Sequence, residues 1–164
     1  MGVVSVVVTT ASGSATGAVT LAAFAPSFLL LDGKHVAGII LRSDGSGAYG
    51  GGTYDIIGPT GTSLGYSTVP AMAGDIVELF AVGLGPTNPP VPAGRPFTGA
   101  ATTTIAPNFS INNVSVTPKF VGLSGAGLYQ INLTVPTGLG IGDVALSALV
   151  GSSQTQTGVV LSLR

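Results

Sequence analysis

Histidine, serine and aspartate are the residue types in this sequence that could combine for catalysis. His35 is the only histidine of the chain and follows Asp32 and Gly33 in the stretch LDGKHVAG. Ser124 lies in GLSGAG, which resembles a nucleophile-bearing turn of hydrolases, except that Ala126 replaces the second glycine. A serine nucleophile needs a base such as histidine beside it. The lone histidine therefore favours a polar residue after a tight Asp-Gly turn over a catalytic triad.

A glycine pair after an apolar run raises a second kind of chemistry, phosphate binding. The run is AGDIVELFAVGLGPTNPP, residues 73–90, with the pair at Gly83 and Gly85. A dinucleotide-binding loop needs a third glycine and then a helix N-terminus, whereas prolines follow here and oppose a helix. We expect a strand that ends in a turn where both glycines adopt backbone angles that other residues resist, and no nucleotide cofactor.

Three tyrosines offer the one surface in the sequence that is suited to a sugar. Tyr49, Tyr54 and Tyr66 lie in or near a glycine-rich segment and could stack on sugar rings. The chain has no tryptophan and only 6% aromatic residues. A carbohydrate-binding module that uses these tyrosines is therefore the alternative hypothesis.

Metal ligands are sparse. Cysteine is absent, which excludes thiolate sites and disulfides. The glycine-rich segment 42–55 carries oxygen ligands at Asp44, Ser46 and Asp55, but it fits neither the helix-flanked calcium loop nor the glycine-aspartate nonapeptide repeat. We expect a mobile or edge-covering loop there, and no metal ion.

Composition bounds the class of protein. With 164 residues, 45% of them hydrophobic, the chain can bury a real core. Only 7% of residues are charged and the net charge is -1, so there is no basic stripe to bind nucleic acid. No apolar run is long enough to span a membrane, and the valine-rich N-terminus, without Lys or Arg before Lys34, reads as a strand instead of a signal peptide.

Short strand patterns fill the sequence, and Gly or Pro interrupts almost every helical window. The clearest strand is YQINLTVP, where Tyr129, Ile131, Leu133 and Val135 alternate with polar residues. The pattern predicts an all-β sandwich of about ten or more strands with little or no helix. The remaining expected strands cover residues 3–9, 18–24, 27–31, 36–42, 53–57, 75–82, 101–105, 114–121, 143–150 and 157–163.

An internal similarity suggests how the chain is organised. Residues 2–23 and 142–163 both read as a strand, a polar turn and a second strand. We interpret residues 1–72 as the closing hairpin of a preceding repeat plus a connecting region, and residues 73–164 as one complete sandwich unit; similarity between two valine-rich hairpins by composition alone is the other interpretation. The matched pairs are Gly2 with Gly142, Val4 with Val144, Val19 with Val159 and Leu21 with Leu161.

The combination AGDIVELFAVGLGPTNP, GLYQINLTVP and GDVALSALVGSSQTQTGVVLSL resembles a family of C-terminal domains of Solibacter-type acidobacteria. The resemblance covers about residues 70–164, with Asp75 where Glu is commoner and Ala81 and Val82 before the glycine turn. It implies an immunoglobulin-like β-sandwich of exported proteins, without assigned catalytic residues.

The function expected from these observations is a non-catalytic extracellular or cell-surface module for structure, adhesion or protein interaction, not an enzyme. Its expected partners are other domains of a larger exported protein or a surface partner. The hairpin at residues 2–23 has strand edges that need a partner. It is expected either to complete a small sheet with residues 24–68 or to form a homodimer with a second chain.

Overall fold

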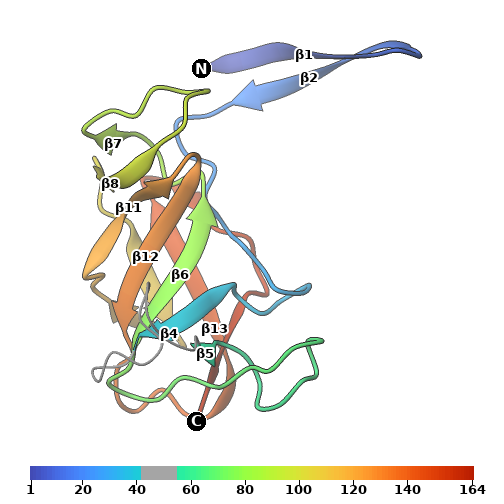
Figure 1. Cartoon of the computed structure of the whole chain (residues 1–164). Helices are drawn as coiled ribbons and strands as arrows, with labels where there is room; N and C mark the ends of the chain where they lie inside the picture. The colour runs from blue at the N-terminus through green and yellow to red at the C-terminus, as the bar shows by residue number, and fades with distance from the viewer. Residues whose placement is uncertain (42–54) are drawn as a thin grey trace.

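The computed structural model describes residues 1–41 and 55–164, and these residues contain no helix (Figure 1). The prediction of an all-β fold is confirmed. The strands are β1 (Gly2–Thr10), β2 (Gly13–Leu21), β3 (Ser27–Phe28), β4 (Gly38–Leu41), β5 (Asp55–Ile56), β6 (Ile76–Val82), β7 (Thr87–Asn88), β8 (Thr98–Thr103), β9 (Asn108–Ile111), β10 (Val114–Val116), β11 (Phe120–Gly125), β12 (Leu128–Thr134), β13 (Gly142–Val150), β14 (Ser153–Gln154) and β15 (Val160–Leu163).

Two antiparallel sheets form the body of the molecule. The larger has the order β5-β4-β6-β12-β11-β8-β7, with β3 also paired to β6. The smaller has the order β10-β9-β13-β14, with β15 also paired to β13. Buried side chains from both sheets form one hydrophobic core, which includes Leu79 and Ile131 from the larger sheet and Phe109 and Leu161 from the smaller. The body is therefore a β-sandwich, as expected.

The central strands of the larger sheet follow the predicted pattern. In β12, Tyr129, Ile131 and Leu133 are buried while the residues between them are half-buried. β6 lies between β4 and β12 and buries Val77, Leu79 and Ala81 on its inner face. The apolar residues that alternate along the sequence of β12 face the core, and the residues between them lie on the outer face.

The larger sheet extends across the predicted boundary between residues 72 and 73. β3 and β4 both pair with β6, and bridges join His35 to Val160 and Ala71 to Leu163 in the smaller sheet. Residues 24–72 thus contribute strands and edges to the same sandwich as residues 73–164, outside the segment 42–54 that the structure does not describe.

Two strand predictions differ from the structure in an informative way. Residues 114–121 form two strands instead of one, since Pro118 lacks the backbone N–H that a continuous ladder needs. β2 begins at Gly13 instead of residue 18, because the polar Ser, Thr and Gly residues read as a turn pair directly with β1. The two strands enclose only Ala11 and Ser12.

The hairpin β1–β2, which we call the arm, projects from one end of the body, and the C-terminus lies at the opposite end (Figure 1). All eighteen of its strand residues are exposed. Within the described residues, the arm forms a separate two-stranded sheet with an unbroken nine-pair register. No described strand of residues 24–68 pairs with this hairpin, since β3 and β4 pair with β6 in the body.

Candidate functional site

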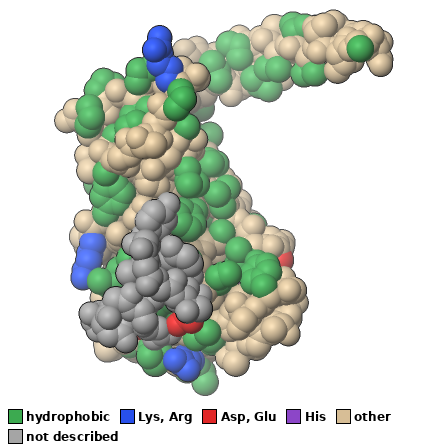
Figure 2. All heavy atoms as spheres, viewed as in Figure 1, with side chains coloured by type: hydrophobic (Ala, Val, Ile, Leu, Met, Phe, Trp, Pro, Cys, Tyr) green, Lys and Arg blue, Asp and Glu red, His purple; other side chains and the backbone are tan. Residues whose placement is uncertain are grey.

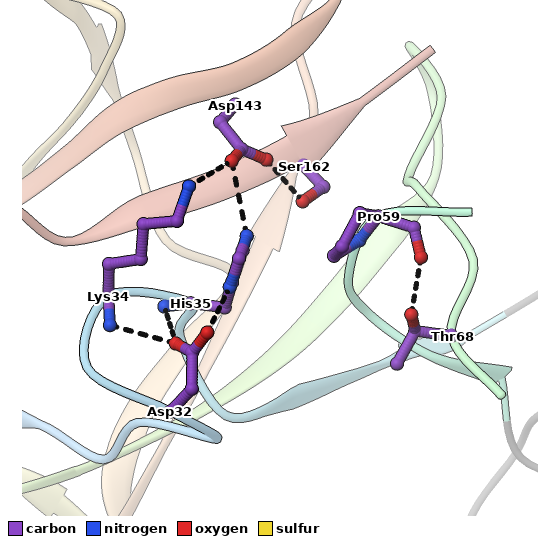
Figure 3. Close-up of polar contacts among 7 residues, drawn as sticks. All are labelled: Asp32, Lys34, His35, Pro59, Thr68, Asp143 and Ser162. Carbon is purple, nitrogen blue, oxygen red and sulfur yellow. Dashed lines mark hydrogen bonds and ion pairs between the residues drawn. The ribbon is translucent and has the colours of Figure 1, made fainter. Parts of the chain in front are cut away.

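His35 is held between two carboxylates at the junction of the two sheets (Figure 3). Its Nδ1 lies 2.8 Å from Asp32 Oδ2, and its Nε2 lies 3.1 Å from Asp143 Oδ2. Asp32 Oδ1 also accepts hydrogen bonds from the backbone N–H groups of Lys34 (2.8 Å) and His35 (2.7 Å). The expected polar turn after Asp32 is therefore present, but the histidine that follows is only 6% exposed.

Asp143, on β13, gathers the remaining contacts of this cluster. Its Oδ2 accepts a hydrogen bond from Lys34 Nζ at 2.7 Å, and its Oδ1 accepts one from the Ser162 hydroxyl at 2.7 Å (Figure 3). We call Asp32, Lys34, His35, Asp143 and Ser162 the clasp. The clasp ties the turn between β3 and β4 to β13 and β15, and so joins the first part of the body to its last hairpin.

The electrostatics of the clasp favour charged carboxylates. The hydrogen bond from Lys34 is the main cause that lowers the pKa of Asp143 below its ordinary value. Backbone N–H groups, first that of His35, hold the pKa of Asp32 far below the ordinary range. Each ring nitrogen of His35 lies within hydrogen-bond distance of a carboxylate oxygen. The arrangement is that of an ion-pair and hydrogen-bond tie.

The structure does not bring His35 and Ser124 together. Ser124 is on β11 in the larger sheet, whereas His35 pairs along β15 in the smaller one. Both ring nitrogens of His35 lie against carboxylates, and the serine of the cluster, Ser162, donates to Asp143. A nucleophile would need a free imidazole nitrogen, which this geometry does not offer.

A second perturbed group is Glu78, on the outer face of β6. The side chain is 3% exposed, and its Oε1 has no hydrogen-bond partner in the described structure. Desolvation raises its pKa. Its neighbours across the ladder are Ile39 on β4 and Asn132 on β12, neither of which is an acid or a base.

The tyrosines of the sugar-binding alternative fall in two groups. Tyr66 lies in a loop of the body and is 38% exposed. Tyr49 and Tyr54 lie outside the described residues, as do Asp44 and Ser46 of the suggested calcium loop. Asp55, at the start of β5, is described and half-buried. The described chain contains no group of three or more acidic or histidine side chains arranged for a metal ion.

The glycine turn after β6 accommodates the link that joins the arm to the body. Gly83 and Gly85 have φ angles of 70° and 98°, as predicted. A Cβ at Gly83 would lie 2.0 Å from the Ala25 carbonyl oxygen, and one at Gly85 would lie 2.3 Å from the Phe24 ring. The N–H of Ala25 donates to the Gly83 carbonyl at 3.0 Å. No helix follows the turn. Because Gly83 and Gly85 have no Cβ, Phe24 and Ala25 of the link can lie directly against the turn.

An apolar cavity of about 740 Å³ lies beside this end of the body, lined by the loop 91–96 and by Leu123 and Tyr129. Its size suits a small molecule. The Tyr129 hydroxyl donates to the Gly85 carbonyl, and Arg95 is the charged residue of the lining. The cavity therefore lacks a paired acid and base.

No family model matches the chain, and neither a curated protein nor a solved structure matches it. Residues 1–41 and 55–164 include no apolar helix of membrane-spanning length.

Proposed function

We propose that the chain is a non-catalytic extracellular or cell-surface module that serves structure and adhesion through protein contacts made by its arm. The observation that carries the proposal is the exposure of the arm, a regular hairpin that pairs with no other described strand. The apolar patches of soluble monomers are rarely left contiguous and exposed without a binding role. The arm is the part of the molecule built for contact with something else.

The arrangement of charge supports a contact surface over a catalytic one. Residues 2–23 contain no Lys, Arg, Asp or Glu, and Figure 2 shows no blue or red side chain along the arm. The one histidine of the chain is committed to the clasp. The charged groups of the clasp thus join parts of the body, while the arm presents apolar and hydroxyl-bearing residues.

Three finer features belong to the same proposal. We propose an immunoglobulin-like sandwich, an exported bacterial location, and an arm that repeats the design of the closing hairpin. The resemblance of residues 70–164 to exported acidobacterial domains supports the first two. The matched positions of residues 2–23 and 142–163 support the third.

A glycan array of the purified chain tests this proposal against the sugar-binding alternative. The full chain, a variant without residues 1–22 and the Tyr66→Ala variant are compared. We expect no sugar signal from any of the three, and unchanged cooperative unfolding of the body in the deletion variant, because the deleted residues pair only with each other. A sugar signal that is lost in Tyr66→Ala would contradict the proposal and favour a carbohydrate-binding module.

A further inference from the structure

The two faces of the arm differ in character. In the β1–β2 register, the even-numbered residues of β1 share one face with the odd-numbered residues of β2. That face holds valine, leucine, alanine and glycine, with Thr10 as its one polar side chain. The opposite face carries hydroxyl groups, including those of Thr9 and Ser14, which lie 2.9 Å apart. We call the first face the apolar face of the arm.

Nothing within the arm requires a glycine at position 17, in the middle of β2. A glycine inside a strand weakens it and marks a bulge, a bend or the close approach of another surface. The register is continuous through Gly17, its φ is not in the left-handed region, and a Cβ there would meet nothing within 4 Å. The arm therefore leaves an empty space on its apolar face for a surface that comes from outside.

The apolar face is complementary to itself. Three of its cross-strand pairs join a large residue to a small one: Val6 with Gly17, Val8 with Ala15, and Leu21 with Gly2. Consider a second arm turned by half a turn about the long axis that the two arms share. Its β1 then lies over β2 of the first arm, so that the large residue of each of these three pairs faces the small residue of the other copy, while Val4 faces Val19.

We propose that the apolar face binds the apolar face of a second copy of this chain, with Val6 of each copy packed over Gly17 of the other. This proposal rests on the proposed function and names the partner of its arm. The result is a four-stranded, two-layer contact with two-fold symmetry. The two bodies are held at the bases of the paired arms.

The absence of charge on the arm suits this partner, and the area of the face sets the strength of the contact. A two-fold contact brings identical groups together, which costs nothing in an arm without charges. Strands of nine residues give a face about 30 Å long and about 10 Å wide, so about 600 Å² is covered in total. Stable complexes bury about 1,200 Å² or more. The arm therefore forms a weak dimer, whose strength multiplies where many copies share a surface.

Sedimentation equilibrium of the full chain tests the proposal, with loading concentrations from roughly 10 to 1,000 µM to bracket a weak complex. We expect the mean mass to rise from monomer towards dimer, and to stay at monomer in the variant without residues 1–22. Val6→Gly leaves a void and Gly17→Val fills the space that receives Val6. Each is expected to weaken the dimer about tenfold or more.

The double variant Val6→Gly with Gly17→Val is the decisive comparison. It moves the large residue to the other strand without changing the composition of the face, so we expect it to restore dimerisation to within about threefold of the wild type. Unfolding of the body reports that the body of each variant is folded, and restored dimerisation of the double variant, which carries the same Val6→Gly change, shows that the arm still forms.

Four results would overturn the proposal. The first is a constant monomer mass over the whole concentration range, and the second is association that persists when the arm is removed. The third is association that neither single substitution weakens, as expected for pairing at the strand edges. The fourth is association that Gly17→Val strengthens, as expected for non-specific hydrophobic association. None of them alters the glycan-array result, so this inference can fail while the proposed function stands.

Discussion

The arm and the closing hairpin of the body have turns of the same length and lie in opposite environments. Thr10 pairs with Gly13 at the tip of the arm, and Val150 pairs with Ser153 at the tip of the β13–β14 hairpin. Both turns thus enclose two residues. Yet every strand residue of the arm is exposed, whereas β13 buries Val144 and its alternate neighbours.

The difference teaches that local hairpin chemistry does not decide burial. β13 is covered because the larger sheet lies across from it and because His35 and Lys34 hold it through Asp143. The position that corresponds to Asp143 in the arm is Val3, which is 74% exposed. A hairpin with a two-residue turn can therefore lie over a core or project from it, according to whether a second layer covers it.

The two hairpins also differ in the return strand. Beyond the tip, Val144 pairs with Leu161, while the corresponding Val4 pairs with Val19, two residues nearer the turn. Thr155 and Gln156 lie in the stretch that absorbs this shift. The Thr155 hydroxyl oxygen accepts the Ala148 N–H at 3.0 Å, and Gln156 bonds both backbone groups of Phe28. A shift of two residues keeps the inner face inward.

The largest expected effect compares Leu146→Asp with Val6→Asp at corresponding positions. Leu146 is 3% exposed, so a carboxylate there lacks solvation and should destabilise the fold by more than about 4 kcal/mol. Val6 is 43% exposed, so its substitution should change the free energy of unfolding by less than about 0.5 kcal/mol. Urea unfolding of both variants measures the contrast. Similar losses in the two would show that the arm is part of the cooperative body.

An intermediate effect compares Gln156→Ala with Thr16→Ala. Gln156→Ala leaves the N–H and C=O of the buried Phe28 without their side-chain partner, at a cost of about 2 kcal/mol. Thr16, its counterpart in the arm, is exposed, and its loss should be neutral. Thermal unfolding should separate the two variants by about 4–8 °C. Equal melting temperatures would mean that the shifted return strand does not depend on this contact.

The smallest effect is a pH dependence that the clasp gives to the body and not to the arm. The charged form of Asp143 stabilises the fold above its ordinary pKa of 3.8, and this contribution is lost as pH falls through the lowered value in the folded state. Asp143→Asn should cost about 1 kcal/mol at neutral pH, and the deficit should shrink in acid. Melting temperatures between pH 2 and 7, with Val3→Asn as the matched control, measure it. A deficit that stays constant with pH would exclude the carboxylate charge as its cause.

The sequence predicted those features that depend on neighbours along the chain. Alternation in residues 129–135 identified a strand and its buried face, and the glycine turn was recognised by its prolines. The clasp was beyond such reasoning, because Asp143 lies 108 residues from His35 and only the pairing of sheets brings them together. For the same reason the sequence did not reveal that β3 and β4 pair with β6, across the boundary placed after residue 72.

The contact between the link and the glycine turn at Gly83 and Gly85 has a mechanical consequence. Phe24 and Ala25 are held against the turn at the end of β6, the strand that lies between β4 and β12. A pull on the arm therefore reaches the glycine turn at the end of β6, through Phe24 and Ala25, before it reaches the two-residue strand β3. The contact between the link and this turn is thus the first part of the body to carry tension.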